Sequence, residues 1–201
     1  METTVAHRVG KIIRKTKETN IELVLDLDGS GQSRVKTPVP FLSHMLEAFS
    51  KHSGFDLKVA AKGDTHVDDH HTVEDIGICL GAALEKALGD KKGITRYGHF
   101  FVPLDEALVR CVVDLSGRSF IHFALDLNVK KRIGTFDTEL VEDFFKAAAD
   151  NGKFNLHLEK IHGRNSHHIV EAAFKSFARA LKMAAAFDGK AKGVPSTKGN
   201  L

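Results

Sequence analysis

The sequence is poor in the residues that build disulfide frameworks and aromatic binding surfaces. Its 201 residues include two cysteines, one tyrosine and no tryptophan. Cys79 and Cys111 each lie inside an apolar run. This position predicts two buried thiols rather than a disulfide, which suits a reducing cytoplasm.

Long apolar runs and a strong charge of one sign are also missing. No run approaches the roughly 20 apolar residues that span a bilayer, and residues 1–5 lack the apolar core of a secretory signal. The formal net charge is +3, and the basic residues are spread along the chain, which gives no argument for nucleic-acid or membrane binding. We therefore expect a cytoplasmic protein with no nucleic-acid and no membrane partner.

Histidine is the residue in excess. The chain has 12 histidines, and four of them form adjacent pairs, at positions 70–71 and 167–168. The remaining composition, 42% hydrophobic and 27% charged, is that of an ordinary globular protein. The length allows one large domain or two small ones.

The chain reads as two copies of one unit. The segment Val24-Leu25-Asp26-Leu27-Asp28-Gly29 aligns with Val112-Val113-Asp114-Leu115-Ser116-Gly117, 88 residues later, and the first histidine pair aligns with the second, 97 residues later. Such self-similarity predicts a tandem duplication. We place a first repeat at residues 1–91, a second at 92–187, and a C-terminal tail at 188–201 that contributes to a phosphate site.

The predicted secondary structure repeats as well. Alternating or β-branched runs predict strands, and apolar residues at helical spacing predict helices. Strands are expected at 7–16, 21–27, 55–61, 98–102, 107–115, 119–125 and 154–160, and helices at 41–52, 70–88, 138–150 and 167–186. The expected class is α+β, with two similar halves, each a small mixed or antiparallel sheet backed by two helices.

Each histidine pair opens a motif, HHxxE, at the start of a predicted helix. His70 and Glu74 are separated by four residues and share a helix face, while adjacent histidines diverge by about 100°. The two histidines of one pair are therefore suited to bind two different metal ions. The motif of the other repeat would supply the remaining ligands of each ion. The candidate ligands are His70, His71, Glu74, His167, His168 and Glu171, with His44 as a further candidate.

Imidazoles with carboxylates and no thiolate suit Mn, Fe, Zn or Co. Because the glutamate follows the pair rather than lying inside it, the spacing is not that of an HExxH zinc protease. Asp64, Asp68 and Asp69 precede the first motif, where they could orient imidazoles or cap the helix.

Other groups could bind an anion or move a proton. Arg96, Arg118 and the tail segment Ser196-Thr197-Lys198-Gly199 could converge on a phosphate, although isolated basic residues are more often solvated surface charges. Glu18 lies between two predicted strands, where a turn could present it as an acid or base.

These residues resemble those of one known family, the imidazoleglycerol-phosphate dehydratases of histidine biosynthesis, over nearly the whole chain. The matching segments include 16–19, 41–46, 63–64, 69–75, 96–98, 104–107, 114–118, 163–168, 174–175 and 196–199.

The resemblance implies dehydration of imidazoleglycerol phosphate to imidazoleacetol phosphate, with two Mn(II) ions per active site. It also implies a homo-oligomer of 24 subunits with active sites at the interfaces. The metal ligands would be His44, His70, His71, Glu74, His167, His168 and Glu171. Glu18 would be the acid/base and contact the substrate, Glu171 would be a second catalytic carboxylate, and Arg96, Arg118, Lys175, Ser196, Thr197 and Lys198 would bind substrate and phosphate.

The chain departs from the family pattern at Asp143, the counterpart of His44 in the second repeat, where many members have histidine. A carboxylate is an acceptable ligand for Mn(II), but it is shorter than histidine. Either Asp143 binds the metal, or a neighbouring group or water completes that shell.

Two other functional classes share some of these features. A dinuclear phosphatase also combines two metals with phosphate-binding cations. Some RNA-binding modules share a sheet with two helices, but they use basic and aromatic surfaces, and this chain has only 7% aromatic residues and no basic stripe.

Overall fold

A computed structural model describes residues 7–127, 131–190 and 193–201. The strands within these ranges are β1 (Val9–Lys15), β2 (Thr19–Asp26), β3 (Ser33–Lys36), β4 (Asp56–Gly63), β5 (Tyr97–Leu104), β6 (Ala107–Asp114), β7 (Phe120–Ala124), β8 (Arg132–Ile133), β9 (Phe136–Asp137) and β10 (Asn155–His162). The helices are α1 (Pro40–Ser53), α2 (His70–Leu88), α3 (Leu140–Gly152) and α4 (Ser166–Ala185).

The two repeats build two sheets with the same strand order. The first sheet runs β1-β2-β4-β3 and the second β5-β6-β10-β7. In both sheets one pair of strands is parallel, β3 with β4 and β7 with β10, and the other neighbours are antiparallel. The predicted α+β class, with two similar halves that each contain a mixed sheet and two helices, is confirmed.

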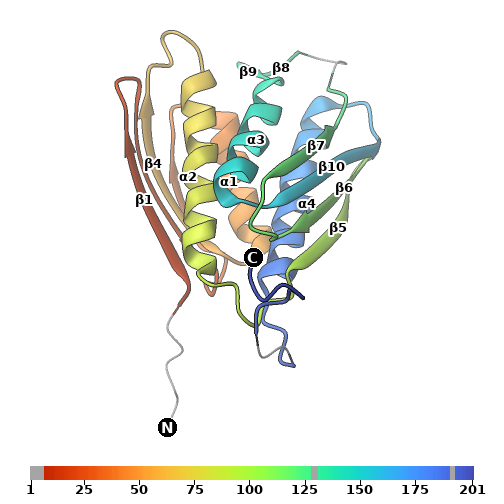
Figure 1. Cartoon of the computed structure of the whole chain (residues 1–201). Coiled ribbons are helices and arrows are strands. Elements are labelled where there is room, and N and C mark those ends of the chain that lie inside the picture. Colours follow the sequence, from red (N-terminus) through yellow and green to blue (C-terminus); the bar gives the residue numbers. More distant parts are fainter. Residues whose placement is uncertain (1–6, 128–130, 191–192) are drawn as a thin grey trace.

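The four helices lie between the two sheets, which form the outer layers (Figure 1). Alternate residues of the central strands point inward and are fully buried, among them Ile21, Leu23 and Leu25 of β2 and Val109, Cys111 and Val113 of β6. One core runs through both halves. The boundary between the repeats at residue 91 stays a prediction.

Each helix pair in the middle layer joins the two repeats. Helix α1 packs against α4, and α2 packs against α3. The ring centroids of Phe49, on α1, and Phe177, on α4, lie 5.7 Å apart. Residues on α1 can therefore meet residues on α4, although more than 100 positions separate them in the sequence.

Two glycines allow α2 and α3 to approach closely. A Cβ atom at Gly77 would lie 2.6 Å from the carbonyl oxygen of Phe144, and one at Gly81 would lie 2.3 Å from that of Ala148. The two glycines are one helical turn apart and form a flat strip on α2. This strip sets the position of α3, and with it the position of Asp143.

Three short strands were not predicted. Strand β3 has three exposed residues and one half-buried residue, so it lacks the alternation that marks a strand, and its place at the sheet edge favours short, charged sequences. Strands β8 and β9 have two residues each, too few to show a period. The predicted helix at 138–150 begins later, at Leu140.

The two thiols are buried and unpaired, as predicted. Burial raises the pKa of Cys79 to about 11, and it also raises the pKa of Cys111. Both thiols are therefore protonated and unreactive at neutral pH. Within the described residues, no helix is long and apolar enough to cross a membrane.

We expect Gly81→Ala to destabilise the protein. In a solvated helix this change is favourable by about 1 kcal/mol. Here the new methyl group would collide with the backbone of α3, and overpacking of this kind costs roughly 1–3 kcal/mol. The measurement is the thermal melting midpoint followed by circular dichroism.

The matched control is Gly189→Ala, because a Cβ atom at Gly189 meets nothing within 4 Å. A Gly81→Ala variant as stable as the wild type would contradict the close approach of α2 and α3.

Candidate metal centre and phosphate pocket

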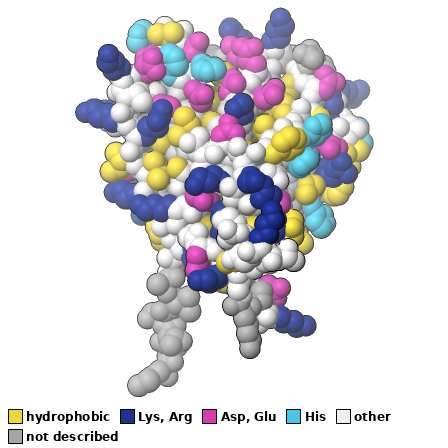
Figure 2. Space-filling view, in the orientation of Figure 1, with side chains coloured by type: hydrophobic (Ala, Val, Ile, Leu, Met, Phe, Trp, Pro, Cys, Tyr) yellow, Lys and Arg dark blue, Asp and Glu magenta, His cyan; other side chains and the backbone are white. Residues whose placement is uncertain are grey.

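Both histidine pairs lie at the same end of the molecule. Helices α2 and α4 begin at the upper end in Figure 1, where the β1–β2 and β5–β6 turns also lie. Figure 2 shows histidine and acidic side chains side by side at this upper end. We call it the histidine end.

One cluster of candidate metal ligands is formed by His44, His167 and Glu171. Their ligand atoms all lie within 4.8 Å of one another. The Oε2 atom of Glu171 is 3.2 Å from Nε2 of His167 and 3.5 Å from Nε2 of His44. His44 comes from α1 in the first repeat and the other two from α4 in the second, so the α1–α4 packing creates the cluster.

Glu171 is held as a carboxylate. Burial alone would raise its pKa, but the hydrogen bond from Lys175 and the neighbouring imidazoles outweigh burial and lower the pKa below its usual range. Nζ of Lys175 lies 2.6 Å from Oε1 of Glu171. An ionised carboxylate between two imidazoles is a donor set that suits a divalent transition metal.

The corresponding group from the first motif contains His70 and Asp143. Nδ1 of His70 lies 3.5 Å from Oδ2 of Asp143, which comes from α3 in the second repeat. Asp143 therefore faces the first motif as His44 faces the second, which is the correspondence that the duplication predicts. Glu74 lies exposed one turn further along α2.

The second histidine of each pair is held by a carboxylate. Nδ1 of His71 lies 3.1 Å from Asp64, and Nδ1 of His168 lies 2.7 Å from Glu106. The contact with Asp64 raises the pKa of His71, and the contact with His168 lowers the pKa of Glu106 to about 2. Because an ionised carboxylate only accepts hydrogen bonds, each Nδ1 is the donor.

Of the acidic residues before α2, one orients an imidazole and another caps the start of the helix, which are the two predicted roles. Asp64 orients an imidazole, whereas the side chain of Asp68 accepts a hydrogen bond from the backbone N–H of His70 at 2.8 Å. Asp69 lies at the N-cap position and makes no side-chain capping bond. Burial, aided by Asp68 and Asp137, raises its pKa.

Glu18 lies in the β1–β2 turn, as predicted, and its carboxylate is 4.0 Å from Nδ1 of His71. The start of β2 is anchored to α2 beside it, because the hydroxyl of Thr19 donates to the buried Asp75. Arg14 donates to the other oxygen of Asp75 at 2.8 Å. Glu18 is thus exposed on a turn whose position is fixed by the hydrogen bonds of Arg14 and Thr19 to Asp75.

The basic and hydroxyl residues predicted to bind phosphate line a pocket of about 850 Å³ at the opposite end. Its lining includes Arg96, Arg118, Ser196, Thr197 and Lys198. Arg96 forms two hydrogen bonds to Asp114, at 2.7 and 3.2 Å, and donates to the carbonyl oxygen of Pro195 at 2.8 Å. Arg96 therefore holds the tail against the body of the protein.

The two ends are far apart within one chain. Strand β6 runs between them from Ala107 to Asp114, seven residue steps or roughly 24 Å at 3.4 Å per residue. Lys175 is the exception among the predicted phosphate ligands, because it lies at the histidine end beside Glu171. The structure brings the other five together with one another but not with the histidines.

The two histidine motifs are not joined by the contacts described. The compact cluster found among the described ranges takes its members from α1 and α4 alone. The expectation that the second motif completes the metal shell of the first stays a prediction.

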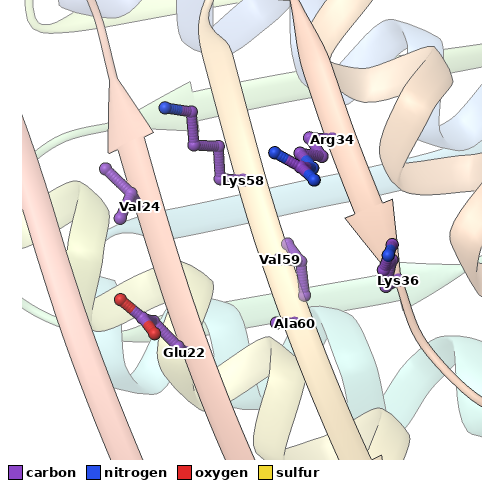
Figure 3. Close-up of a pocket in the computed structure, with 7 residues that line it drawn as sticks. All are labelled: Glu22, Val24, Arg34, Lys36, Lys58, Val59 and Ala60. Carbon is purple, nitrogen blue, oxygen red and sulfur yellow. The ribbon is translucent and has the colours of Figure 1, made fainter.

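A further pocket, of about 280 Å³, lies on the outer face of the first sheet. Figure 3 shows Glu22 together with Arg34, Lys36 and Lys58 around it. It contains no histidine and lies on the face of the sheet away from the helices, so it contributes nothing to the histidine end.

Sequence reasoning overlooked two acidic residues of this region, Glu106 and Asp75. Glu106 lies 88 residues after Glu18, the offset that relates the two repeats over their first strands. This offset was the signal that could have identified it. Asp75 was also overlooked, although it directly follows the first HHxxE motif.

Clustered imidazoles and carboxylates at one end, with a cationic pocket at the other, are typical of enzymes that act on small anionic substrates. The fold and these two sites define that class of protein.

A family model described as imidazoleglycerol-phosphate dehydratase matches residues 37–181. The imidazoleglycerol-phosphate dehydratase of Prochlorococcus marinus (strain NATL1A) is 54% identical over 195 residues, which cover 96% of both chains. That of Bacillus subtilis (strain 168) is 54% identical over 194 residues, covering 96% of this chain and 100% of the relative.

Two solved structures have the same fold. The enzyme from Staphylococcus aureus aligns with a TM-score of 0.81 at 42% identity, covering 90% of this chain and 99% of the other. The enzyme from Pyrococcus furiosus, solved in complex with (S)-C348, aligns with a TM-score of 0.80 at 36% identity, covering 94% and 100%.

The chain belongs to the imidazoleglycerol-phosphate dehydratase family. It is therefore a hydro-lyase of the dehydration step in histidine biosynthesis. This membership favours a dehydratase over both the phosphatase and the RNA-binding alternatives.

We expect Arg96→Gln to release the tail. The variant loses the charged hydrogen bonds to Asp114 and Pro195. This loss should raise the fraction of molecules with a detached tail by roughly tenfold. Cleavage by trypsin after Lys198, followed by intact-mass spectrometry, measures the effect.

Arg118→Gln is the control, because the hydrogen bond described for the Arg118 guanidinium goes to Ser116 in its own turn. Equal cleavage rates in the two variants would show that Arg96 does not hold the tail.

Proposed function

We propose that the chain catalyses the metal-dependent dehydration of imidazoleglycerol phosphate to imidazoleacetol phosphate in the cytoplasm. Two Mn(II) ions serve each active site, and each site lies between copies in a homo-oligomer of 24 subunits. The cluster of His44, His167 and Glu171, with all ligand atoms within 4.8 Å, carries the proposal.

The donors present fit such a metal. His44 and His167 offer imidazole nitrogens, and Glu171 offers a carboxylate whose lowered pKa keeps it ionised. His70, Asp143 and Glu74 supply the same kinds of donor on the other helix pair, and His71 and His168 complete the set. Mixed nitrogen and oxygen donors without thiolate suit Mn(II).

The chemical problem is a carbon-bound proton with no adjacent carbonyl group to acidify it. When bound, the metal ions supply a Lewis acid that stabilises the negative charge developing on the imidazole ring of the substrate. Within the chain, Glu18 accepts the proton from carbon and returns a proton to the departing hydroxyl group, which leaves as water. The resulting enol becomes the ketone.

The position of Glu18 supports this role. Its carboxylate is exposed and lies 4.0 Å from His71, so it reaches the space beside a candidate metal ligand. The anchoring of the turn by Asp75 restricts the backbone, while the Glu18 side chain stays exposed to solvent. General acid–base catalysis requires a positioned and accessible carboxylate.

The phosphate group has its own set of residues. Arg96, Arg118, Ser196, Thr197 and Lys198 offer guanidinium, hydroxyl and ammonium donors in one pocket, and such donors bind phosphate strongly. This pocket lies roughly 24 Å from the histidine end along β6, farther than one small substrate extends. A complete active site therefore needs the histidine end of one subunit and the phosphate pocket of another subunit.

Glu18→Gln should lower kcat by roughly 10²- to 10⁴-fold, the usual contribution of a general acid–base group. The amide cannot transfer the proton, whereas the metal ligands and the phosphate pocket are unchanged. Product formation is followed by the absorbance of the new enol or ketone, and bound manganese is measured in the same samples.

Glu22→Gln is the matched control, because Glu22 pairs with Lys11 on the outer face of the first sheet. Full turnover in Glu18→Gln with manganese bound would remove Glu18 from the mechanism.

Co-assembly of two inactive variants tests the shared site. Glu18→Gln impairs the histidine end and Arg118→Ala the phosphate pocket. If each site combines these ends from two copies, random mixing restores roughly a quarter of wild-type activity. The mixed particle should have a mass near 530 kDa, about 24 times the 22.0 kDa of one chain.

A site contained in one copy would give no recovery, because every chain in the mixture has one defective end. Lack of recovery in a particle shown to contain both variants would therefore reject the interface site. A metal-free wild-type monomer that retains full activity would reject both the metal and the assembly.

A further inference from the structure

The two repeats use one acidic position in different ways. Glu18 in the β1–β2 turn and Glu106 in the β5–β6 turn are related by the same 88-residue offset as the flanking strands. Each lies next to the second histidine of its motif, His71 or His168. The distances differ: 4.0 Å for Glu18 and 2.7 Å for Glu106.

Glu106 is bound by three donors at once. Its Oε2 atom accepts the hydrogen bond from Nδ1 of His168. Its Oε1 atom accepts from the backbone N–H groups of Asn165, at 2.7 Å, and Arg164, at 3.2 Å. One carboxylate thus fixes both the loop that starts α4 and the imidazole that follows it.

In the first repeat, Glu18 does not have to connect its turn to the helix, because other residues that the second repeat lacks form that connection. In the first repeat Asp75 accepts from Thr19 and Arg14 and so anchors the turn to α2. The equivalent positions in the second repeat are Ala172, Ala107 and Val102. None of these side chains can form the anchor, so in the second repeat the carboxylate of the turn itself connects to α4.

We propose that Glu106 is a positioning residue that holds His168 with its proton on Nδ1 and thereby keeps Nε2 available to a metal ion. The inference rests on the proposed function, because it assigns Glu106 to a ligand of the proposed metal. Partners of this kind fix the ring orientation and tautomer of metal-binding histidines. Glu106 itself takes no part in proton transfer.

Glu106→Gln separates this role from a simple packing role. The amide has nearly the same shape, but it offers one acceptor oxygen in place of two. If that oxygen stays with the loop amides, the NH₂ group faces His168 and favours the tautomer with its proton on Nε2. If the oxygen faces His168, the loop amides lose their acceptor.

The experiment is a titration of metal-free, full-length protein with Mn(II), in which free Mn(II) is measured by electron paramagnetic resonance. Wild type, Glu106→Gln and the control Glu22→Gln are compared, with circular dichroism of each metal-free protein. We expect Glu106→Gln to weaken Mn(II) binding at one class of site by about 10- to 100-fold, and Glu22→Gln to bind as the wild type does.

The outcomes are distinguishable. Wild-type Mn(II) affinity in Glu106→Gln would overturn the positioning role while leaving the proposed function intact. Failure of wild type and control alike to bind Mn(II) would overturn the proposed metal, and this inference with it.

If Glu106→Gln loses the native circular dichroism spectrum, Glu106→Asp replaces it. The shorter side chain keeps the charge but cannot reach His168 and the loop amides together. Weakened binding in the folded Glu106→Asp protein supports the role, and unchanged binding overturns it.

Discussion

The packing of helices from different repeats against one another is the constraint on which the site depends. Each sheet buries one face under its helices, and the four helices are buried in turn only because the two halves meet through them. This arrangement places α1 against α4 and α2 against α3. His44 consequently meets His167 and Glu171, and Asp143 meets His70. Burial of the core and assembly of the candidate ligands have the same cause.

Duplication supplied two copies of each functional position, and the copies have since diverged. The Glu18 carboxylate lies 4.0 Å from His71, beyond hydrogen-bond distance, whereas Glu106 accepts hydrogen bonds from His168 and two backbone amides. His44 offers an imidazole where the other repeat offers the carboxylate of Asp143. The division of roles is possible because a buried network around Asp75 exists in one repeat and is replaced by apolar residues in the other. A symmetric scaffold can thus carry an asymmetric site.

Much of the fold was predictable from local pattern. The long helices and central strands show strong periodicity, so α2, α4, β2 and β6 were predicted close to their observed bounds. The edge strand β3 was missed because exposed, charged residues do not alternate. At the site, the histidine motifs were proposed from residue type and spacing, whereas the roles of Glu18 and of the residues around Arg118 were proposed from the resemblance to the family. Glu106 was not, because a carboxylate in a turn resembles any solvated turn residue until its three donors are known.

The sequence by itself determined the duplication, the α+β class, the kinds of donor available and the family to which the chain is similar, since these depend on residue order and short-range periodicity. Tertiary structure alone decided which donors meet. The ligand cluster joins residues more than 100 positions apart, and the phosphate pocket lies at the far end of the strands from the histidines. Spacing along a chain determines neighbours only within one helix or strand. Contacts between elements follow from how their buried faces fit together, which no local pattern records.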